Sequence, residues 1–357
     1  MVSTKLEVPT QNINTHLVDA YVALLLLIVF LSLVGNIVVL TALYTQQANL
    51  RNSMDVFIAN IAVSDIISSF SATFTLNNAK LQWSSGAGTC KMCYYLLFVS
   101  YAVVILTLCF ASVDRFFGIC LPTKRRQVFL LKKQVISICL IWILSCVLFA
   151  PYIYAYDVKE FKLPKENTKE LCMQTWSSDS EQIYFTLVMF SLFFLSPIAL
   201  FVFVFFKVFQ KLHEPRSTAS GGNAILHKKR KRMTLMLLLM VTLHYICWSP
   251  SIIANLGHIF GTETTPSYFN LWLVFELLHF LRCLIYPSVY FTMYLNVRES
   301  LKALISFKSS SRSNPVNSTA ATTQAKDLSL PSSVPVSSAA SDRSASYVPD
   351  DDMYTSM

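Results

Sequence analysis

Seven apolar segments, each long enough to cross a lipid bilayer, dominate this sequence of 357 residues. About 20 helical residues span the roughly 30 Å of bilayer hydrocarbon. The segments that reach this length lie near residues 18–44, 54–76, 92–113, 134–155, 183–206, 233–257 and 268–291. Only 14% of the residues are charged, against about 25% in a typical soluble domain. The sequence therefore predicts an all-α membrane protein with a seven-transmembrane helix bundle.

The remaining segments divide the chain around a transmembrane domain at 18–291. Residues 1–17 are polar and lack the order of a cleaved signal peptide, so we expect an extracellular N-terminal segment. Residues 292–307 include the amphipathic run LNVRESLKALISF, which predicts a short interfacial eighth helix. Residues 308–357 are rich in Ser, Thr, Ala and Pro without apolar periodicity, which predicts a disordered cytoplasmic tail.

Basic residues are concentrated on one side of the predicted bundle. HKKRKR at 227–232 precedes the sixth segment, and Lys124, Arg125 and Arg126 follow the third. On the other side, the lysines within 159–169 alternate with acidic residues. Because Lys and Arg accumulate in cytoplasmic loops, the N-terminus is expected outside the cell and the tail inside. This topological role accounts for the net charge of +9; we expect a lipid bilayer, and no nucleic acid, around the chain.

Each apolar segment carries at least one recognisable residue or motif. In chain order these are Gly35-Asn36, Asp65 at the end of IANIAVSD, Cys90 with Asp114-Arg115-Phe116, Trp142, Pro197, Cys247-Trp248-Ser249-Pro250 and Tyr286-Pro287-Ser288-Val289-Tyr290. Any one of them is weak evidence, but the ordered set resembles the rhodopsin-like (class A) G-protein-coupled receptors over about residues 18–307. The nearest similarity is to the neuropeptide-receptor branch.

The resemblance implies a plasma-membrane receptor that signals through a heterotrimeric G protein. It implies neither an enzyme nor a cofactor, and the sequence has no Cys and His spacing typical of a metal site. The Ser- and Thr-rich tail offers phosphorylation sites for a receptor kinase and for arrestin.

Two parts of the family pattern concern the ends of the third segment. The resemblance implies a disulfide between Cys90 and Cys172, which an oxidising outer face allows. It also implies that Asp114 holds Arg115 in the inactive state and that Arg115 faces the G protein in the active state. Phe116 stands where the family usually has Tyr. The alternative is a snorkelling charge pair that only sets topology.

The family's activation switch maps onto the sixth and seventh segments. Its residues here are Trp248, Pro250, Tyr286, Pro287 and Tyr290. Both prolines remove backbone hydrogen bonds and are expected to kink their helices. Trp248 would lie at the floor of the ligand cavity; simple core packing is the alternative reading.

A polar stripe runs along the seventh segment. Glu276, His279, Arg282, Tyr286 and Tyr290 are separated by 3, 3, 4 and 4 residues, which places them on one helical face. Charges inside a membrane are costly and typically paired, so this face should point into the bundle.

Asp65 is the partner that we expect for Arg282. In the resembling family this aspartate belongs to a sodium pocket, but Arg282 and Tyr286 alter that pocket here. We predict an Asp65–Arg282 ion pair in place of bound sodium. The alternative leaves Arg282 bonded to backbone carbonyls or water beside a protonated Asp65.

The ligand is constrained mainly by what the chain lacks. Leu97 stands where amine receptors of the family carry an aspartate, and Phe280 stands where opsins carry the retinal lysine. Acidic residues outnumber basic ones on the outer side, which favours a basic or amidated peptide. The candidate ligand-binding residues are Leu97, Phe98, Tyr101, Trp248, Asn255, Glu276 and His279. Glu276 is the expected partner of a cationic ligand group.

Other functions remain as alternatives to a peptide receptor. Within the family, the chain could signal without a ligand or bind a non-peptide small molecule. A transporter would usually show inverted repeats or broken helices, which the sequence lacks. No HExxH or GxSxG motif indicates a membrane enzyme.

Overall fold

The protein is represented by a computed structural model that describes residues 15–45, 53–80, 82–122, 131–161, 168–213, 221–260 and 266–302. The predicted tail at 308–357, residues 303–307 of the predicted eighth helix, residues 1–14 and the basic residues Lys124 to Arg126 lie outside these ranges. Within them, seven helices are long and apolar enough to cross a membrane. The predicted fold class is therefore confirmed.

The spans are built from single helices and from helices interrupted near a proline. Single helices form the first three spans and the last two: α1 (Thr15–Tyr44), α2 (Ser53–Ala79), α3 (Gly86–Cys120), α9 (Gly221–Ile259) and α10 (Pro266–Met293). The fourth span joins α5 (Leu131–Phe149) to α6 (Pro151–Ala155). The fifth joins α7 (Asp179–Phe190), the π-helix η2 (Ser191–Leu195) and α8 (Ser196–His213).

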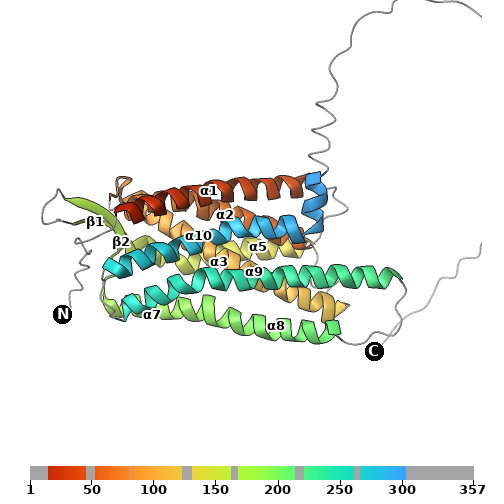
Figure 1. The fold of residues 1–357 in the computed structure, drawn as a ribbon. Helices are drawn as coiled ribbons and strands as arrows, with labels where there is room; N and C mark the ends of the chain where they lie inside the picture. The colour runs from red at the N-terminus through yellow and green to blue at the C-terminus, as the bar shows by residue number, and fades with distance from the viewer. Residues whose placement is uncertain are drawn as a thin grey trace, which may run out of the picture. The chain divides into compact units, whose positions relative to one another are not determined.

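Helix α3 lies in the middle of the bundle, in contact with α2, α5, α8 and α9 (Figure 1). Its central residues Val103, Val104 and Ile105 are fully buried on successive faces of the helix. A helix that is apolar all round is one that is buried all round. By contrast, Phe30 of α1 and Val202 of α8 are more than 60% exposed, as expected for side chains that face lipid.

The π-helix in the fifth span is explained by Pro197. Proline has no N–H and its ring crowds the carbonyl four residues earlier, so regular α-helix is disfavoured just before it. One turn of wider helix absorbs the mismatch, since the N–H of Ser196 bonds to the carbonyl of Ser191, five residues back. Helix α7 begins at a cap: the Ser178 side chain accepts a 3.2 Å hydrogen bond from the Glu181 N–H.

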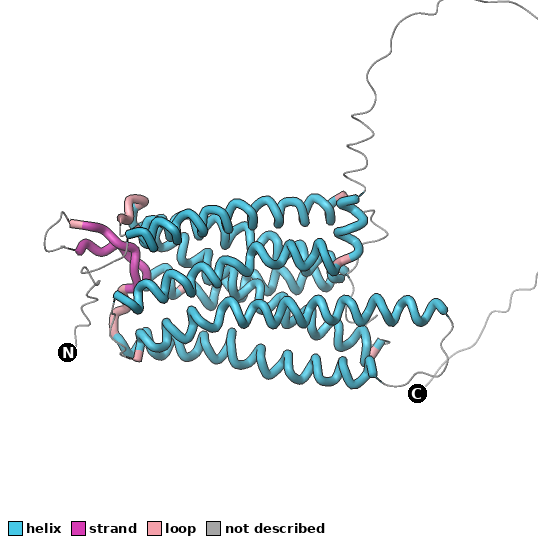
Figure 2. The backbone as a smooth tube through the Cα atoms, viewed as in Figure 1, coloured by secondary structure: helices cyan, strands magenta, loops and turns pink. Residues whose placement is uncertain are grey.

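A two-stranded hairpin closes one end of the bundle. Strands β1 (Tyr156–Phe161) and β2 (Lys169–Gln174) pair antiparallel, with Val158 opposite Cys172. Figure 2 shows both strands beyond the helix ends, and this end is called the hairpin end below. The hairpin is the connection that the sequence places between the fourth and fifth spans.

At the opposite end, a short helix at 295–302 follows α10. Its start is tied to α2, because the Tyr294 hydroxyl donates a 2.6 Å hydrogen bond to Asp55 Oδ1 and Asn296 Nδ2 donates to the same oxygen at 3.3 Å. The described part of the predicted eighth helix is therefore helical and attached to the bundle.

Helices α1 and α10 approach closely where α10 contains Pro287. A Cβ atom added at Gly35 would lie 3.0 Å from Pro287 Cβ and 3.1 Å from its Cγ. Close to this point, Asn36 Nδ2 donates a 3.1 Å hydrogen bond to the Cys283 carbonyl. The Gly35-Asn36 pair thus allows the close approach and bonds the two helices together. Both Pro250 and Pro287 lie inside continuous helices.

Candidate functional site

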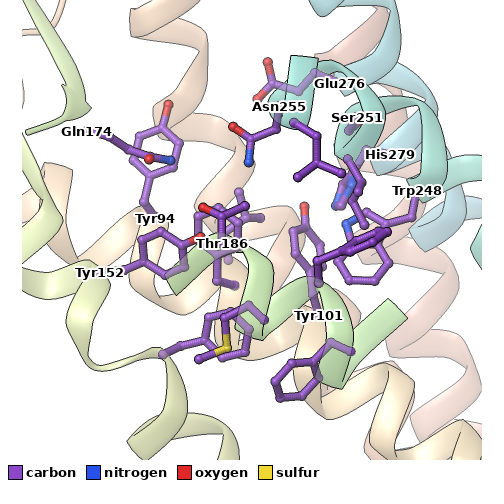
Figure 3. Close-up of a pocket in the computed structure, with 18 of the residues that line it drawn as sticks. Tyr94, Tyr101, Tyr152, Gln174, Thr186, Trp248, Ser251, Asn255, Glu276 and His279 are labelled. Atoms are coloured by element: carbon purple, nitrogen blue, oxygen red, sulfur yellow. The ribbon is translucent and has the colours of Figure 1, made fainter. Parts of the chain in front are cut away.

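A cavity of about 220 Å³ lies towards the hairpin end of the bundle (Figure 3). Both hairpin strands contribute to its lining, through Tyr156 of β1 and Gln174 of β2. The seven residues that the sequence proposed for ligand binding also line it: Leu97, Phe98, Tyr101, Trp248, Asn255, Glu276 and His279. Helices α3, α9 and α10 therefore bring these side chains together, although their role in binding remains a prediction.

One wall of the cavity is a stack of aromatic rings, of which the sequence had suggested Phe98 but not Tyr94, Tyr152 or Tyr156. Phe98 and Tyr152 stack with centroids 4.1 Å apart, and Tyr94 and Tyr156 stack at 4.2 Å. The only sequence signal was position: Tyr94 lies one turn after Cys90, and Gln174 lies two residues after Cys172. Because Cys90 and Cys172 form a disulfide, Tyr94 and Gln174 lie close to each other at the cavity.

The other side of the cavity is more polar. Figure 3 shows Asn255, Glu276 and His279 across the cavity from Tyr152 and Gln174. Glu276 Oε2 accepts a 3.0 Å hydrogen bond from the Tyr21 hydroxyl of α1, a contact that the sequence did not suggest. His279 is 6% exposed, and its Nε2 has no hydrogen-bond partner among the described residues.

The charge of the lining is acidic. Among the described residues that line the cavity, Glu276 is the one carboxylate and none is a lysine or an arginine. On the hairpin side, burial raises the pKa of the Tyr156 phenol above its ordinary value, so this hydroxyl stays neutral at physiological pH. Gln174 Nε2 donates a 3.0 Å hydrogen bond to it. A ligand thus meets one acid among neutral hydroxyls, amides and rings.

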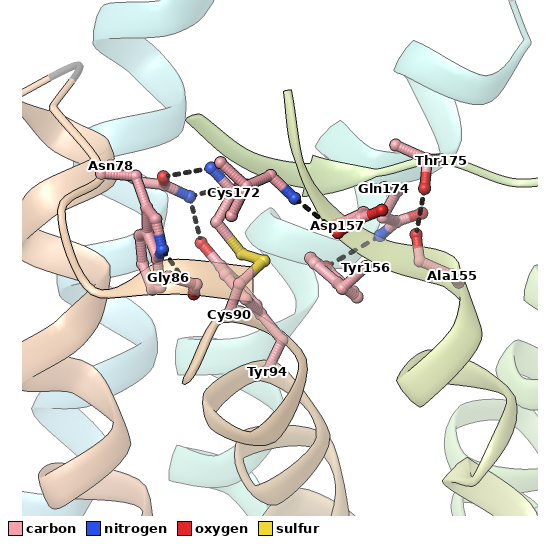
Figure 4. The surroundings of a disulfide bond; sticks show 12 residues. Asn78, Gly86, Cys90, Tyr94, Ala155, Tyr156, Asp157, Cys172, Gln174 and Thr175 are labelled. Carbon is pink, nitrogen blue, oxygen red and sulfur yellow. Dashed lines mark hydrogen bonds between the residues drawn. A yellow bond between two sulfur atoms is a disulfide. The ribbon is translucent and has the colours of Figure 1, made fainter. Parts of the chain in front are cut away.

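The predicted disulfide between Cys90 and Cys172 is present, with the two Cα atoms 5.6 Å apart (Figure 4). Asn78 of α2 supports it: Asn78 Nδ2 donates to the Cys172 carbonyl at 2.6 Å, and the Cys172 N–H donates to Asn78 Oδ1 at 2.9 Å. Nearby, the Trp83 N–H donates to the Glu170 carbonyl at 2.8 Å. The hairpin is therefore held to the ends of α2 and α3. Cys93, one turn after Cys90, is a buried free thiol.

The cavity floor is formed by aromatic side chains of α3, α9 and α10. The Tyr101 ring lies 3.9 Å from the His279 ring and 6.1 Å from the Trp248 ring, centroid to centroid. Trp248 also lies 5.3 Å from His244, which is fully buried one turn earlier on α9. Trp248 is thus placed at the floor, between the cavity and the middle of the bundle.

Below the floor, Arg282 and Asp65 form an ion pair between α10 and α2. Arg282 Nη1 donates a 2.7 Å hydrogen bond to Asp65 Oδ1, and both side chains are at most 1% exposed. Asp65 Oδ2 has no hydrogen-bond partner among the described residues, so one hydrogen bond rather than a bidentate pair joins them. The guanidinium carbon also lies 5.9 Å from the Tyr101 ring centroid and 5.3 Å from that of Tyr286, within cation–π range.

Two switch tyrosines follow Arg282 on α10. The Tyr286 hydroxyl donates a 3.2 Å hydrogen bond to the Met240 carbonyl of α9 and lies 3.4 Å from His244 Nδ1. Tyr290 is fully buried, and its hydroxyl has no hydrogen-bond partner among the described residues. Tyr286 therefore ties α10 to the α9 backbone at Met240, which precedes Pro250 by ten residues.

At the end of α3 away from the hairpin, Asp114 and Arg115 pair with each other. Arg115 Nε donates a 3.1 Å hydrogen bond to Asp114 Oδ2, and Arg115 Nη2 also bonds to that oxygen. Arg115 is 8% exposed and Asp114 is fully buried. Phe116 turns to α8, with its ring 6.1 Å from that of Phe203. The pair is closed, the arrangement that the resemblance assigns to the inactive state.

Three known receptors illustrate what this chain is similar to. The chain is 26% identical to the RYamide receptor of Drosophila melanogaster over 75% of its length, and to neuropeptide FF receptor 2 of Rattus norvegicus over 66%. It is 26% identical to galanin receptor type 1 of Homo sapiens over 77%. The chain spans 58% and 59% of the first two relatives and 78% of the third.

Residues 35–290 match the family described as the 7 transmembrane receptor (rhodopsin family). The match covers well over half of the chain and includes all seven of the helices that can cross a membrane, in whole or in part. The seven spans, the central α3 and the disulfide to the hairpin agree with it. This multi-pass membrane protein belongs to the rhodopsin family of seven-transmembrane receptors, which are G-protein-coupled receptors and not enzymes.

Proposed function

We propose that this chain is a plasma-membrane receptor for an extracellular peptide and that it activates a heterotrimeric G protein. The observation that carries the proposal is the cavity of about 220 Å³, which opens beneath the hairpin and combines an aromatic wall with one carboxylate. A receptor for an extracellular peptide needs the N-terminus and the hairpin outside the cell, which agrees with the distribution of Lys and Arg along the chain.

The size of the cavity favours one end of a peptide. Pockets that enclose a whole drug-sized ligand measure about 300–1,000 Å³, which exceeds the 220 Å³ found here. One or two residues of a peptide would enter, and the rest would lie along the hairpin. The names of the relatives above, which are receptors for RYamide, neuropeptide FF and galanin, also support a peptide ligand.

The charge of the cavity favours a basic or amidated peptide end. A free C-terminal carboxylate would be desolvated beside Glu276 with no lysine or arginine in the described lining to neutralise it. A cationic side chain or terminal amine could instead pair with Glu276, and a terminal amide could donate to Glu276 or Asn255.

A peptide library tests the proposal. Cells that express the full chain are exposed to the library and read out by calcium and cAMP, with unliganded signalling measured in parallel. Activation by peptides with a basic or amidated end supports the proposal. High unliganded signalling without any active peptide, or activation by a small molecule alone, would instead favour the alternatives within the family.

Glu276→Gln then tests the charge argument on any active peptide. Removing one partner of a buried charge pair costs about 2–5 kcal/mol, so affinity for a cationic peptide end should fall at least about 30-fold. Glu181→Gln is the matched control, because Glu181 is an exposed acid in the first turn of α7, outside the cavity lining. Equal effects of the two substitutions would contradict direct pairing with Glu276.

On the cytoplasmic side, we propose that Asp114, Arg115 and Phe116 form the G-protein-coupling surface once α9 moves away. The Ser- and Thr-rich tail would recruit a receptor kinase and arrestin. Arg115→Ala should abolish peptide-stimulated G-protein activation while peptide binding remains. Deletion of 308–357 should abolish arrestin recruitment without loss of G-protein activation.

A further inference from the structure

Arg282 of α10 packs against the ring of Tyr101, which lines the cavity, and against the ring of Tyr286, whose hydroxyl is bonded to α9. Its guanidinium is buried and held to Asp65 of α2 by one hydrogen bond of 2.7 Å. Its second terminal nitrogen, Nη2, has the Cys283 thiol at 3.5 Å. Among the described residues, the planar cation therefore has one strong hydrogen-bonded anchor, Asp65.

On the cavity side, the guanidinium faces Tyr101. The guanidinium carbon is 5.9 Å from this ring centroid, and Tyr101 lines the cavity and contacts the His279 ring. Any ligand that moves the Tyr101 ring changes the surface on which the cation packs. Cation–π attraction depends on position over the ring face, so such a movement changes the preferred place of the guanidinium.

On the other side, the guanidinium faces Tyr286. The guanidinium carbon is 5.3 Å from that ring centroid, and the Tyr286 hydroxyl donates to the Met240 carbonyl at 3.2 Å. A shift of the cation thus changes its packing against the Tyr286 ring, and the Tyr286 hydroxyl is bonded directly to the α9 backbone. Met240 itself is fully buried, so this contact is made inside the bundle.

We propose that Arg282 is a positioning residue that transmits the state of the cavity to α9 through Tyr101 and Tyr286. Asp65 Oδ2, which has no hydrogen-bond partner among the residues that the structure describes, allows the second arrangement that such a device needs. Arg–carboxylate pairs often bond through two N–H groups. If the guanidinium rotates so that it also bonds to Asp65 Oδ2, its planar face moves relative to the rings of Tyr101 and Tyr286. The arrangement with one Arg282–Asp65 hydrogen bond and the arrangement with two therefore position Tyr286 differently.

This inference relies on the proposed function only in treating the cavity as the place where a ligand acts, and its test needs neither a ligand nor a G protein. An environment-sensitive fluorophore is attached to Lys231→Cys, an exposed position of α9, in the purified full chain with the exposed Cys139 replaced by Ala. Tyr101→Leu is then compared in two backgrounds: the native pair and the neutral pair Asp65→Leu with Arg282→Met.

We expect Tyr101→Leu to shift the fluorophore emission in the native background and to lose that shift in the neutral-pair background. Tyr152→Leu is the matched control: Tyr152 is a buried tyrosine of the same cavity, but its ring contacts are Phe98, Phe149, Tyr156, Trp176 and Phe185. The shift that it causes should differ between the two backgrounds by less than the shift from Tyr101→Leu does, because Tyr152 reaches Arg282 only indirectly, through Phe98 and Tyr101.

Three results would overturn the proposal: no shift from Tyr101→Leu in the native background, an undiminished shift in the neutral-pair background, or an equal loss for Tyr152→Leu. If the neutral pair does not fold, Arg282→Lys replaces it, because lysine keeps the charge but lacks the planar face. Arg282→Lys should also remove the Tyr101→Leu shift, and an undiminished shift in that background would overturn the proposal equally. A failed peptide screen would leave these outcomes unaffected.

Discussion

The guanidinium of Arg282 and the carboxylate of Asp65 meet in a single 2.7 Å hydrogen bond, with both side chains at most 1% exposed. Helices α10 and α2 are thereby joined by a charge pair in the middle of an apolar bundle. Charges at this depth are costly and are typically paired. The stability and the ion dependence of the receptor should both follow from this pair.

We predict that Arg282→Met alone destabilises the protein by about 3–5 kcal/mol, because Asp65 is left as a buried charge without its partner. The double variant Asp65→Leu with Arg282→Met should recover most of that loss, since apolar residues of similar volume can replace a buried pair at little cost. Thermal unfolding of purified full-length variants measures both. A single variant as stable as the native protein would show that the pair is not coupled.

Sodium should have no effect on ligand affinity. The resemblance places a sodium ion beside Asp65, but here the Arg282 cation already bonds to Asp65 Oδ1. Competition binding in sodium and in choline at equal ionic strength should give the same affinity. Arg282→Asn, which removes the internal cation, should introduce a sodium dependence; a native receptor whose affinity falls in millimolar sodium contradicts the prediction.

Loss of the disulfide should loosen the hairpin and weaken ligand binding. Cys90 and Cys172 lie 82 positions apart in the sequence. Removal of a native disulfide typically costs about 2–5 kcal/mol of folding free energy. Cys172→Ser should lower both the unfolding temperature and the affinity. Cys93→Ala is the control, since Cys93 is a free thiol on the same helix as Cys90. Similar losses in the two variants would argue against a specific role for the bridge.

Gly35 should tolerate no side chain. A Cβ there meets the rigid Pro287 ring at 3.0 Å, and overpacking of this kind costs about 1–3 kcal/mol. Gly35→Ala should therefore lower the unfolding temperature and surface expression. At Gly88 an added Cβ meets nothing within 4 Å, so Gly88→Ala should be neutral or slightly stabilising. Equal stability of both variants would mean that α1 moves away from α10 at no cost.

Much of the site was predictable because a charged side chain within the membrane typically faces the bundle interior and has few possible partners there. The spacing of Glu276, His279, Arg282 and Tyr286 placed them on one inward face of α10, and the structure has all four in the bundle. Asp65 was the expected partner of Arg282 and is the one observed. Whether the pair has one or two hydrogen bonds depends on the separation of α2 and α10, which no sequence pattern encodes.

The sequence by itself determined the seven spans and the inward stripe of α10 through local periods, and the family through an ordered set of motifs; the cysteine pair followed from the resemblance to that family. Only the tertiary structure decided which side chains meet across the bundle. The Tyr21–Glu276 hydrogen bond joins residues 255 positions apart, and Asn78 reaches Cys172 over 94. Such contacts depend on the rotation of each helix against its neighbours, which arises from the packing of all the helices together and not from the period of any one.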